Sequence, residues 1–347
     1  MATALDSLAA CACYRAADYD QLVDSPILAG PLDVHEFRVR GARHDLVDVG
    51  DTAGFDGRRA ASDLGRIVAQ NARFWGGLPY HHYVFLNVFR RGGGGLEHAS
   101  STLLTANAAR TRDPRGYLGW LSFVSHEYLH AYNVKRLRPV ELGPFDYEHA
   151  VPTSGLWIAE GLTSYFGDLM IARAGLAGPD WWLGEMSSEI RQLQNTPGRL
   201  VQTLTQSSLD AWNSENSGVG MDRSNTISYY TKGEVVGLLL DAHIRHLTGG
   251  RRSLDDVMRL AYRRYAGAHG FTAAQFQATA SEVAGTDLGP WLHRALDTTD
   301  ELDYAELLDT YGLRFGAAEG PDRWTLEPSA GATPRQRAEL RALLAPR

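Results

Sequence analysis

The feature of this sequence that most constrains its fold is the pentad His126-Glu127-Tyr128-Leu129-His130, inside a stretch from Gly116 to Asn133. Apolar residues recur there at near-helical spacing after an Asp-Pro pair, so a helix is predicted. On a helix the two histidines are four residues apart, and both imidazoles leave the same face. They can then bind one Zn²⁺ ion, with Glu127 placed to reach a metal-bound water. The alternative is that the histidines cap or line a core helix and that Glu127 is a solvated charge.

A second apolar, helical stretch from Leu156 to Tyr165 supplies a candidate third ligand, Glu160. Glutamate is rarely buried without a partner, so a carboxylate in that setting calls for a cation or a hydrogen-bond network. His126, His130 and Glu160 would form a His₂Glu site with a fourth position open for water, which is the geometry of catalytic zinc. Otherwise Glu160 is an ordinary glutamate on the wet face of a helix.

The composition is ordinary for a soluble globular enzyme, with 44% hydrophobic and 22% charged residues in 347. A chain of this length can form one large or two medium domains. The net charge of -7 and the lack of a basic stripe argue against nucleic acid as the main partner. No run approaches the roughly 18 uninterrupted apolar residues of a membrane span. The chain starts without a basic, then apolar, leader, so a cytoplasmic location is expected.

Two residue types are scarce enough to be informative. The cysteines, Cys11 and Cys13, are too close together to close a long loop and suggest no disulfide framework. The only lysines are Lys135 and Lys232, in a chain that otherwise uses arginine, and both lie in segments assigned to the functional region. A compact ammonium group is one reason to keep a lysine there; persistence of two surface lysines is the other.

Alternating and periodic patterns predict the secondary structure. Residues 14 to 55 read as short strands and turns, 57 to 75 as an amphipathic helix, and 83 to 89 as a strand. Beyond residue 155 the chain is mostly helical. Helices are predicted near 155–174, 180–195, 228–248, 253–265, 271–284 and 288–296, with a loop from Gln206 to Asn225, and residues 334 to 347 form a short polar helix or tail.

Four consecutive glycines, Gly92 to Gly95, follow the strand and precede Leu96-Glu97-His98. Such a run permits unusual backbone angles or the close approach of another backbone, such as that of a substrate. The alternative is a flexible hairpin loop.

A further motif, Ser228-Tyr229-Tyr230-Thr231-Lys232-Gly233, begins one of the predicted helices. A tyrosine at a helix start that faces a zinc site can donate a hydrogen bond to the oxyanion of a tetrahedral intermediate. Either tyrosine, or both, can instead be a core aromatic that fixes the helix entry.

Taken jointly, these motifs resemble the glycyl aminopeptidase family of zinc metallopeptidases, which is related to the alanyl-type aminopeptidases within the gluzincins. The resemblance covers roughly residues 15 to 312. It rests on the order and spacing of four segments: residues 93–98, residues 125–136, residues 156–161 and residues 228–233.

The resemblance implies an α+β fold, a thermolysin-like catalytic domain with a mixed α/β N-terminal lobe and a mainly helical C-terminal lobe. It implies Zn²⁺ held by His126, His130 and Glu160, with Glu127 as general base and later proton donor. Tyr230 would stabilise the intermediate. Glu97, beside Gly94 and Gly95, would bind the free α-amino group of a peptide substrate. A preference for N-terminal Gly or Ala comes from the family alone.

The expected organisation is an extension over 1–14, the α/β lobe over 15–140, the helical lobe over 141–312 and a tail over 313–347. Family members resemble a three-part protein with an N-terminal β domain and a C-terminal PDZ domain. The tail is too short for a PDZ domain of about 80 to 100 residues. The chain is therefore a natural minimal form or a truncated one, and a homo-oligomer or a tendency to aggregate is expected because surface normally covered is exposed.

Three readings of function remain. The first is a zinc aminopeptidase, in which Glu127 passes a proton from the attacking water to the leaving amine. The second is a zinc endopeptidase with the same machinery. The third is a non-catalytic scaffold that retains the fold, which is disfavoured because ligands, base and tyrosine are all present.

Overall fold

The computed structural model describes residues 1–8, 13–212, 223–317 and 319–346. It divides into two compact units: unit 1 is Met1–Arg136, Arg173–Ala177 and Pro346–Arg347, and unit 2 is Leu137–Ala172 and Gly178–Ala345. Helices and strands are mixed, as predicted. Over the described residues, no helix is both long and apolar enough to cross a membrane.

A five-stranded sheet forms the centre of unit 1, in the order β3 (Asp33–Val39), β4 (Ala42–Gly50), β5 (His82–Phe89), β7 (Ser101–Ala106) and β6 (Gly94–Glu97). The β4–β5 and β5–β7 pairs are parallel, and the outer pairs β3–β4 and β6–β7 are antiparallel. The predicted strand at 83–89 is confirmed as β5, whose nearly continuous burial suits a central strand covered on both faces. The glycine-rich strand β6 is therefore the edge of the sheet.

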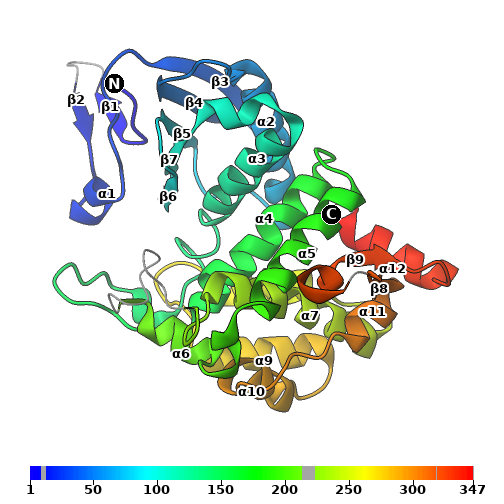
Figure 1. The fold of residues 1–347 in the computed structure, drawn as a ribbon. Helices are drawn as coiled ribbons and strands as arrows, with labels where there is room; N and C mark the ends of the chain where they lie inside the picture. Colours follow the sequence, from blue (N-terminus) through cyan, green and yellow to red (C-terminus); the bar gives the residue numbers. More distant parts are fainter. Residues whose placement is uncertain (9–12, 213–222, 318, 347) are drawn as a thin grey trace. The chain divides into compact units, whose positions relative to one another are not determined.

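Two helices of unit 1 pack against the sheet: α2 (Gly57–Phe74) lies along β3 and β4, and α3 (Pro114–Leu129) lies along β6 and β7 (Figure 1). The predicted helix at 57–75 is confirmed as α2, whose predicted apolar side is buried. On the other side of the sheet, Val47, Val84 and Leu86 contact Ala2 and Leu28 of the N-terminal segment.

The prediction for the start of the chain was incomplete. Besides the strands β1 (Asp6–Leu8) and β2 (Cys13–Arg15), it contains a short helix, α1 (Tyr19–Val23), where only strands and turns were expected. The side chain of Asp18 accepts a hydrogen bond from the Gln21 backbone N–H and caps α1. Cys13 is disulfide-bonded, although no disulfide framework was expected.

Unit 2 is mainly helical (Figure 1). Its longer elements are η3 (Trp157–Gly161), α4 (Leu162–Arg173), α5 (Pro179–Gln194), α6 (Leu204–Leu209), α7 (Tyr229–Thr248), α8 (Leu254–Tyr265), α9 (Ala273–Ala284), α10 (Gly289–Asp297), α11 (Ala305–Tyr311) and α12 (Pro334–Leu344). Short 3₁₀ turns cover Val140–Leu142, Pro197–Leu200, Asp210–Trp212 and Gly320–Trp324, and β8 (Leu313–Phe315) pairs with β9 (Leu326–Pro328). The helix α7 is buried along most of its length and is the central helix of this unit.

Three further predictions need correction, two in unit 2 and one in unit 1. The loop expected from Gln206 to Asn225 begins inside α6, whose Thr203 and Gln206 form a capping box; residues 213–222 lie outside the described residues. The helix expected at 155–174 is a π-helix, η3, followed by α4. The helix predicted to continue to Asn133 ends at Leu129 in α3, after which the backbone turns.

Candidate metal centre

The end of α3 carries both histidines. The helix begins at Pro114, where the Asp113 carboxylate accepts a hydrogen bond from the Gly116 N–H, and its last residue before the turn is Leu129. His130 keeps helical backbone angles as the C-cap, so the four-residue spacing still aligns it with His126. Their Nε2 atoms lie 3.1 Å apart and the rings meet at 87°. The two histidines therefore converge as predicted.

The tautomer of His130 suits a metal ligand. Its Nδ1 lies 2.8 Å from the carbonyl oxygen of Asn133 and is the hydrogen-bond donor, which leaves the lone pair of Nε2 for a metal. Two nitrogen ligands at about 2.05 Å from a tetrahedral zinc ion would lie about 3.3 Å apart. The observed separation of 3.1 Å is close to that value, so the pair fits zinc.

Glu160 lies in η3, where the Leu162 N–H bonds to the Trp157 carbonyl five residues earlier. Such π turns often occur at functional sites, because the extra residue redirects a side chain. The backbone of η3 packs directly on that of α7, since a Cβ on Gly161 would overlap the backbone of Gly233 and the reverse is nearly as close. The direction of Glu160 thus depends on this glycine-to-glycine contact.

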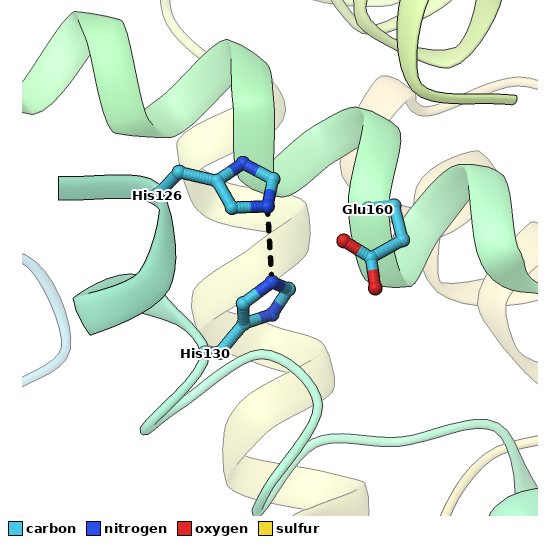
Figure 2. Close-up of side chains that lie close together, drawn as sticks. All are labelled: His126, His130 and Glu160. Carbon is cyan, nitrogen blue, oxygen red and sulfur yellow. Dashed lines mark hydrogen bonds between the residues drawn. The ribbon is translucent and has the colours of Figure 1, made fainter. Parts of the chain in front are cut away.

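His126, His130 and Glu160 each offer a ligand atom, and these atoms lie within 4.8 Å of one another (Figure 2). Two imidazoles and one carboxylate are the donor set of catalytic zinc. A possible metal-binding group with the predicted composition is therefore present. Ser164, expected near this ligand set, donates a hydrogen bond to the backbone carbonyl of Glu160.

Glu97, at the end of the edge strand β6, lies in a second group with Glu127 and His130, again within 4.8 Å. The strand passes against the general-base candidate, because a Cβ on Gly95 would overlap the Glu127 carboxylate. Glu127 is 6% exposed. Gly94 has a φ of 147°, a conformation that side chains rarely adopt. The unusual backbone angles expected of the glycine run are confirmed at Gly94, whereas the close neighbour of Gly95 is a side chain, that of Glu127, and not another backbone.

The two candidate tyrosines lie at the start of α7 and stack on each other, with ring centroids 4.8 Å apart. Tyr230 is 40% exposed, so it is not a core aromatic. Burial and, next, the charge of Glu160 raise the pKa of Tyr229, while its hydrogen bond with Tyr230 opposes the shift. Sequence reasoning singled out Tyr230; the structure adds that Tyr229 is close enough to sense Glu160 and to hold Tyr230.

Sequence reasoning missed Asp24, which follows α1. Its carboxylate contacts Lys135 Nζ at 2.8 Å and His98 Nδ1 at 3.3 Å, and accepts a hydrogen bond from the Ala99 N–H at 2.7 Å. Burial alone would raise the pKa of Asp24, but the His98 hydrogen bond and the Lys135 charge hold it below its ordinary value. The aspartate ties the end of β6 to the chain leaving α3. No sequence pattern marks it, since its partners lie far along the chain.

One protein-family model matches this chain. The family model for M61 glycyl aminopeptidase matches residues 119–236, which include the histidine pair, Glu160 and the two tyrosines. The predicted resemblance is confirmed over that range. No curated protein matches the chain in sequence. The class of protein to which this chain is similar is therefore a peptidase.

Solved structures extend the likeness over most of the chain. The aminopeptidase N family protein from Idiomarina loihiensis is 29% identical, with a TM-score of 0.85 over 90% of this chain and 55% of that one. Yeast LTA4 hydrolase in complex with bestatin (16% identity, TM-score 0.53, 80% of this chain, 42% of that one) and an M1 zinc metallopeptidase from Deinococcus radiodurans (13%, 0.51, 79%, 54%) share the fold. This chain spans about half the length of these proteins.

Proposed function

We propose that this protein is a zinc-dependent aminopeptidase that hydrolyses the N-terminal peptide bond of peptides, with small residues such as Gly or Ala at the N-terminus. The match to an M61 glycyl aminopeptidase model and the likeness to an aminopeptidase N family protein support a peptidase. The size preference rests on that resemblance alone. The thermolysin-like, two-lobed arrangement and a homo-oligomeric state belong to the same proposal.

The observation that carries the proposal is the position of Glu97. Its carboxylate lies within 4.8 Å of ligand atoms of Glu127 and His130, on a strand whose next-but-one residue, Gly95, touches Glu127. A carboxylate there can pair with the ammonium group of a peptide and place its first peptide bond, and no later one, beside Glu127. An endopeptidase has no use for an anion at that point.

The remaining residues then have defined roles. His126, His130 and Glu160 would hold the metal, which when bound supplies a Lewis acid and lowers the pKa of water towards neutrality. Glu127 takes a proton from the attacking water and delivers it to the leaving amine. Tyr230 donates a hydrogen bond to the oxyanion, and Tyr229 orients Tyr230 through the hydrogen bond between them.

The test compares free and N-acetylated peptides in wild type, Glu97→Gln and Glu127→Gln. We expect Glu127→Gln to retain zinc and lose turnover by at least about 1000-fold. Wild type should prefer the free dipeptide by roughly 30-fold or more, and Glu97→Gln should abolish that preference. If wild type cleaves acetylated peptides as well as free ones, the aminopeptidase proposal is wrong and the endopeptidase takes its place. Zinc binding with no turnover of any peptide would favour the scaffold.

A further inference from the structure

A pocket of unit 1 is not used by the roles assigned so far. It has a volume of about 420 Å³ and lies between the β6–β7 hairpin and the first half of α3. One wall is glycine: Gly92, Gly93 and Gly94 from the strand side and Gly119 from the helix. The other wall is aromatic, formed by Trp120 and Phe123.

The aromatic wall is held rigidly. Trp120 is buried and meets Phe55 at 73° with ring centroids 4.9 Å apart, while Tyr117 stacks on it at 5.8 Å. The indole Nε1 of Trp120 is buried and has no hydrogen-bond partner among the described residues. A buried N–H without a partner is costly.

One charged side chain lines the pocket. Arg110 belongs to the 3₁₀ turn Ala108–Arg112, and its side chain is exposed. Its guanidinium forms no hydrogen bond or ion pair with another residue that the structure describes. The turn is held against α3 because Gly116 has no Cβ to overlap the carbonyl of Arg110. A guanidinium without a protein partner, on a backbone that is held in place, can bind an anionic group of a ligand.

The pocket continues directly from the proposed active site. Gly94 lines it, while the next residue, Gly95, touches Glu127. Within the described sheet, β6 is an edge strand, so its outer side can pair with an extended peptide. If the peptide amine lies at Glu97, the end of the strand, the chain can only run back towards Gly92. The residues after the scissile bond then reach this pocket.

The length of the strand limits the length of the peptide. The strand β6 begins at Gly94, and extended chain rises about 3.3 Å per residue, so the three steps from Gly95 to Gly92 cover at most about 10 Å. That distance holds two or three substrate residues after the scissile bond. A side chain among them can lie against Trp120 and Phe123, and the terminal carboxylate comes to the end of the pocket that Arg110 lines.

We propose that this pocket binds the leaving part of the peptide and that Arg110 binds its terminal carboxylate, so that preferred substrates are free peptides of three or four residues. The inference rests on the proposed aminopeptidase function and adds the length and end group of the substrate. It assigns Arg110 as a specificity-determining residue.

The experiment compares Ala-Leu-Phe, its C-terminal amide and alaninamide in wild type, Arg110→Gln and Arg115→Gln. We expect wild type to prefer the free acid to the amide by about fivefold, as for an exposed ion pair. Arg110→Gln should remove the preference. Arg115→Gln should keep it, because Arg115, in the first turn of α3, is also exposed but does not line the pocket. Equal turnover of acid and amide by wild type, or an unchanged ratio in Arg110→Gln, would overturn the proposal.

A second variant fills the pocket without threatening the fold. A Cβ on Gly119 would meet nothing within 4 Å, and replacing a helical glycine favours the helix. Gly119→Leu should therefore lower kcat/KM for Ala-Leu-Phe by at least about tenfold. The loss should appear in the ratio of Ala-Leu-Phe turnover to alaninamide turnover, since the ammonia released from alaninamide does not reach the pocket. Unaltered peptide turnover in this variant would show that the leaving part lies elsewhere.

Binding measured without turnover separates the two proposals. Calorimetric titration of Glu127→Gln with Ala-Leu-Phe and with its amide should give about fivefold tighter binding of the acid, lost when Arg110→Gln is added. If this difference appears but wild type hydrolyses none of the three compounds, the aminopeptidase function is wrong and the pocket assignment stands. If wild type hydrolyses them and the acid and amide bind equally, only the pocket assignment fails.

Discussion

The two segments that supply the proposed metal ligands are built in different ways. The histidines end a regular helix, α3, with a capping aspartate, a proline at its start and a four-residue spacing that fixes their common face. Glu160 lies in a π-helix, and the position of that π-helix depends on backbone contact between Gly161 and Gly233. The local sequence therefore determines the direction of the histidine side chains, whereas a tertiary contact determines that of the glutamate side chain.

The largest expected effect is on the metal. Glu160→Ala should weaken zinc binding by more than about 100-fold, because it removes one of three protein ligands, whereas Glu127→Gln should leave zinc content at about one ion per chain. Zinc content after gel filtration and competition with a chelator measure both. Full metal occupancy in Glu160→Ala would mean that only the α3 segment binds the ion and that the third ligand is another group.

The glycine contact predicts the next largest effect. Gly233→Ala should lower the free energy of unfolding by about 3 kcal/mol and reduce zinc retention, because a Cβ cannot fit without moving η3 away from α7. Gly119→Ala, a helical glycine with open space around its Cβ position, should be neutral or stabilising by about 1 kcal/mol. Urea unfolding measures both. Equal stability of Gly233→Ala and wild type would show that the contact does not hold η3 in place.

The same difference explains what could be predicted from sequence. Helix α2, strand β5 and the histidine pair follow from apolar periodicity, since their side-chain directions repeat with the local backbone. The π-turn at Glu160 does not, because one extra residue per turn leaves no periodic trace in five residues. The short helices α1 and α6 were missed for a related reason: they are held by caps at Asp18 and Thr203 rather than by an apolar face.

A second reason why the sequence does not predict the whole site is that some residues contact partners far along the chain. The glycine run was predicted to allow close approach, but only the structure shows that Gly95 contacts Glu127. Asp24 carried no signal, because its partners His98 and Lys135 are far away in sequence. Of the two tyrosines, the position in the sequence motif predicts Tyr230 as the functional one. Only the structure shows that the charge of Glu160 raises the pKa of Tyr229.

In unit 1, the contact between Gly95 and Glu127 is predicted to affect the rate of hydrolysis rather than the stability of the protein. Gly95→Ala should lower kcat/KM for alaninamide by about 30-fold, because β6 or the Glu127 carboxylate must move. Its melting temperature should stay within a few degrees of wild type, since β6 is a short edge strand. Gly77→Ala, where the added Cβ meets nothing within 4 Å, is the control and should match wild type in both measurements. A stability loss without a rate loss would assign Gly95 a purely structural part.

The two lysines of the chain also differ in their surroundings: one has a charged partner and the other is buried. Lys135, in the chain leaving α3, contacts Asp24 at 2.8 Å. Lys232, beside Gly233 in α7, is 2% exposed, and its ammonium group forms no hydrogen bond or ion pair with another described residue. Burial lowers the pKa of Lys232 to about 8, opposed only by the charge of Glu301. One lysine is therefore paired, and the other is buried at a cost.

The smallest predicted effect follows from that cost. Because the pKa of Lys232 is lower in the folded state than its ordinary 10.5, the unfolded chain binds more protons between pH 8 and 10.5. The buried charge therefore lowers the free energy of unfolding by its full amount below pH 8, and by less as the pH rises from 8 to 10.5. Lys232→Met should stabilise the protein at pH 7 by on the order of 1 kcal/mol, since methionine recovers the burial cost only in part. Lys135→Met should destabilise it by about 1 kcal/mol, because Asp24 loses its partner.

Urea unfolding of both variants at pH 7 and pH 9.5 tests the sign. The stability advantage of Lys232→Met should shrink at the higher pH, where wild type no longer carries the full charge into the folded state. Lys135→Met is the matched control, because that lysine is paired with Asp24 and is not buried without a partner. If the stability advantage of Lys232→Met is unchanged at pH 9.5, the cause of that advantage is packing and not the buried charge.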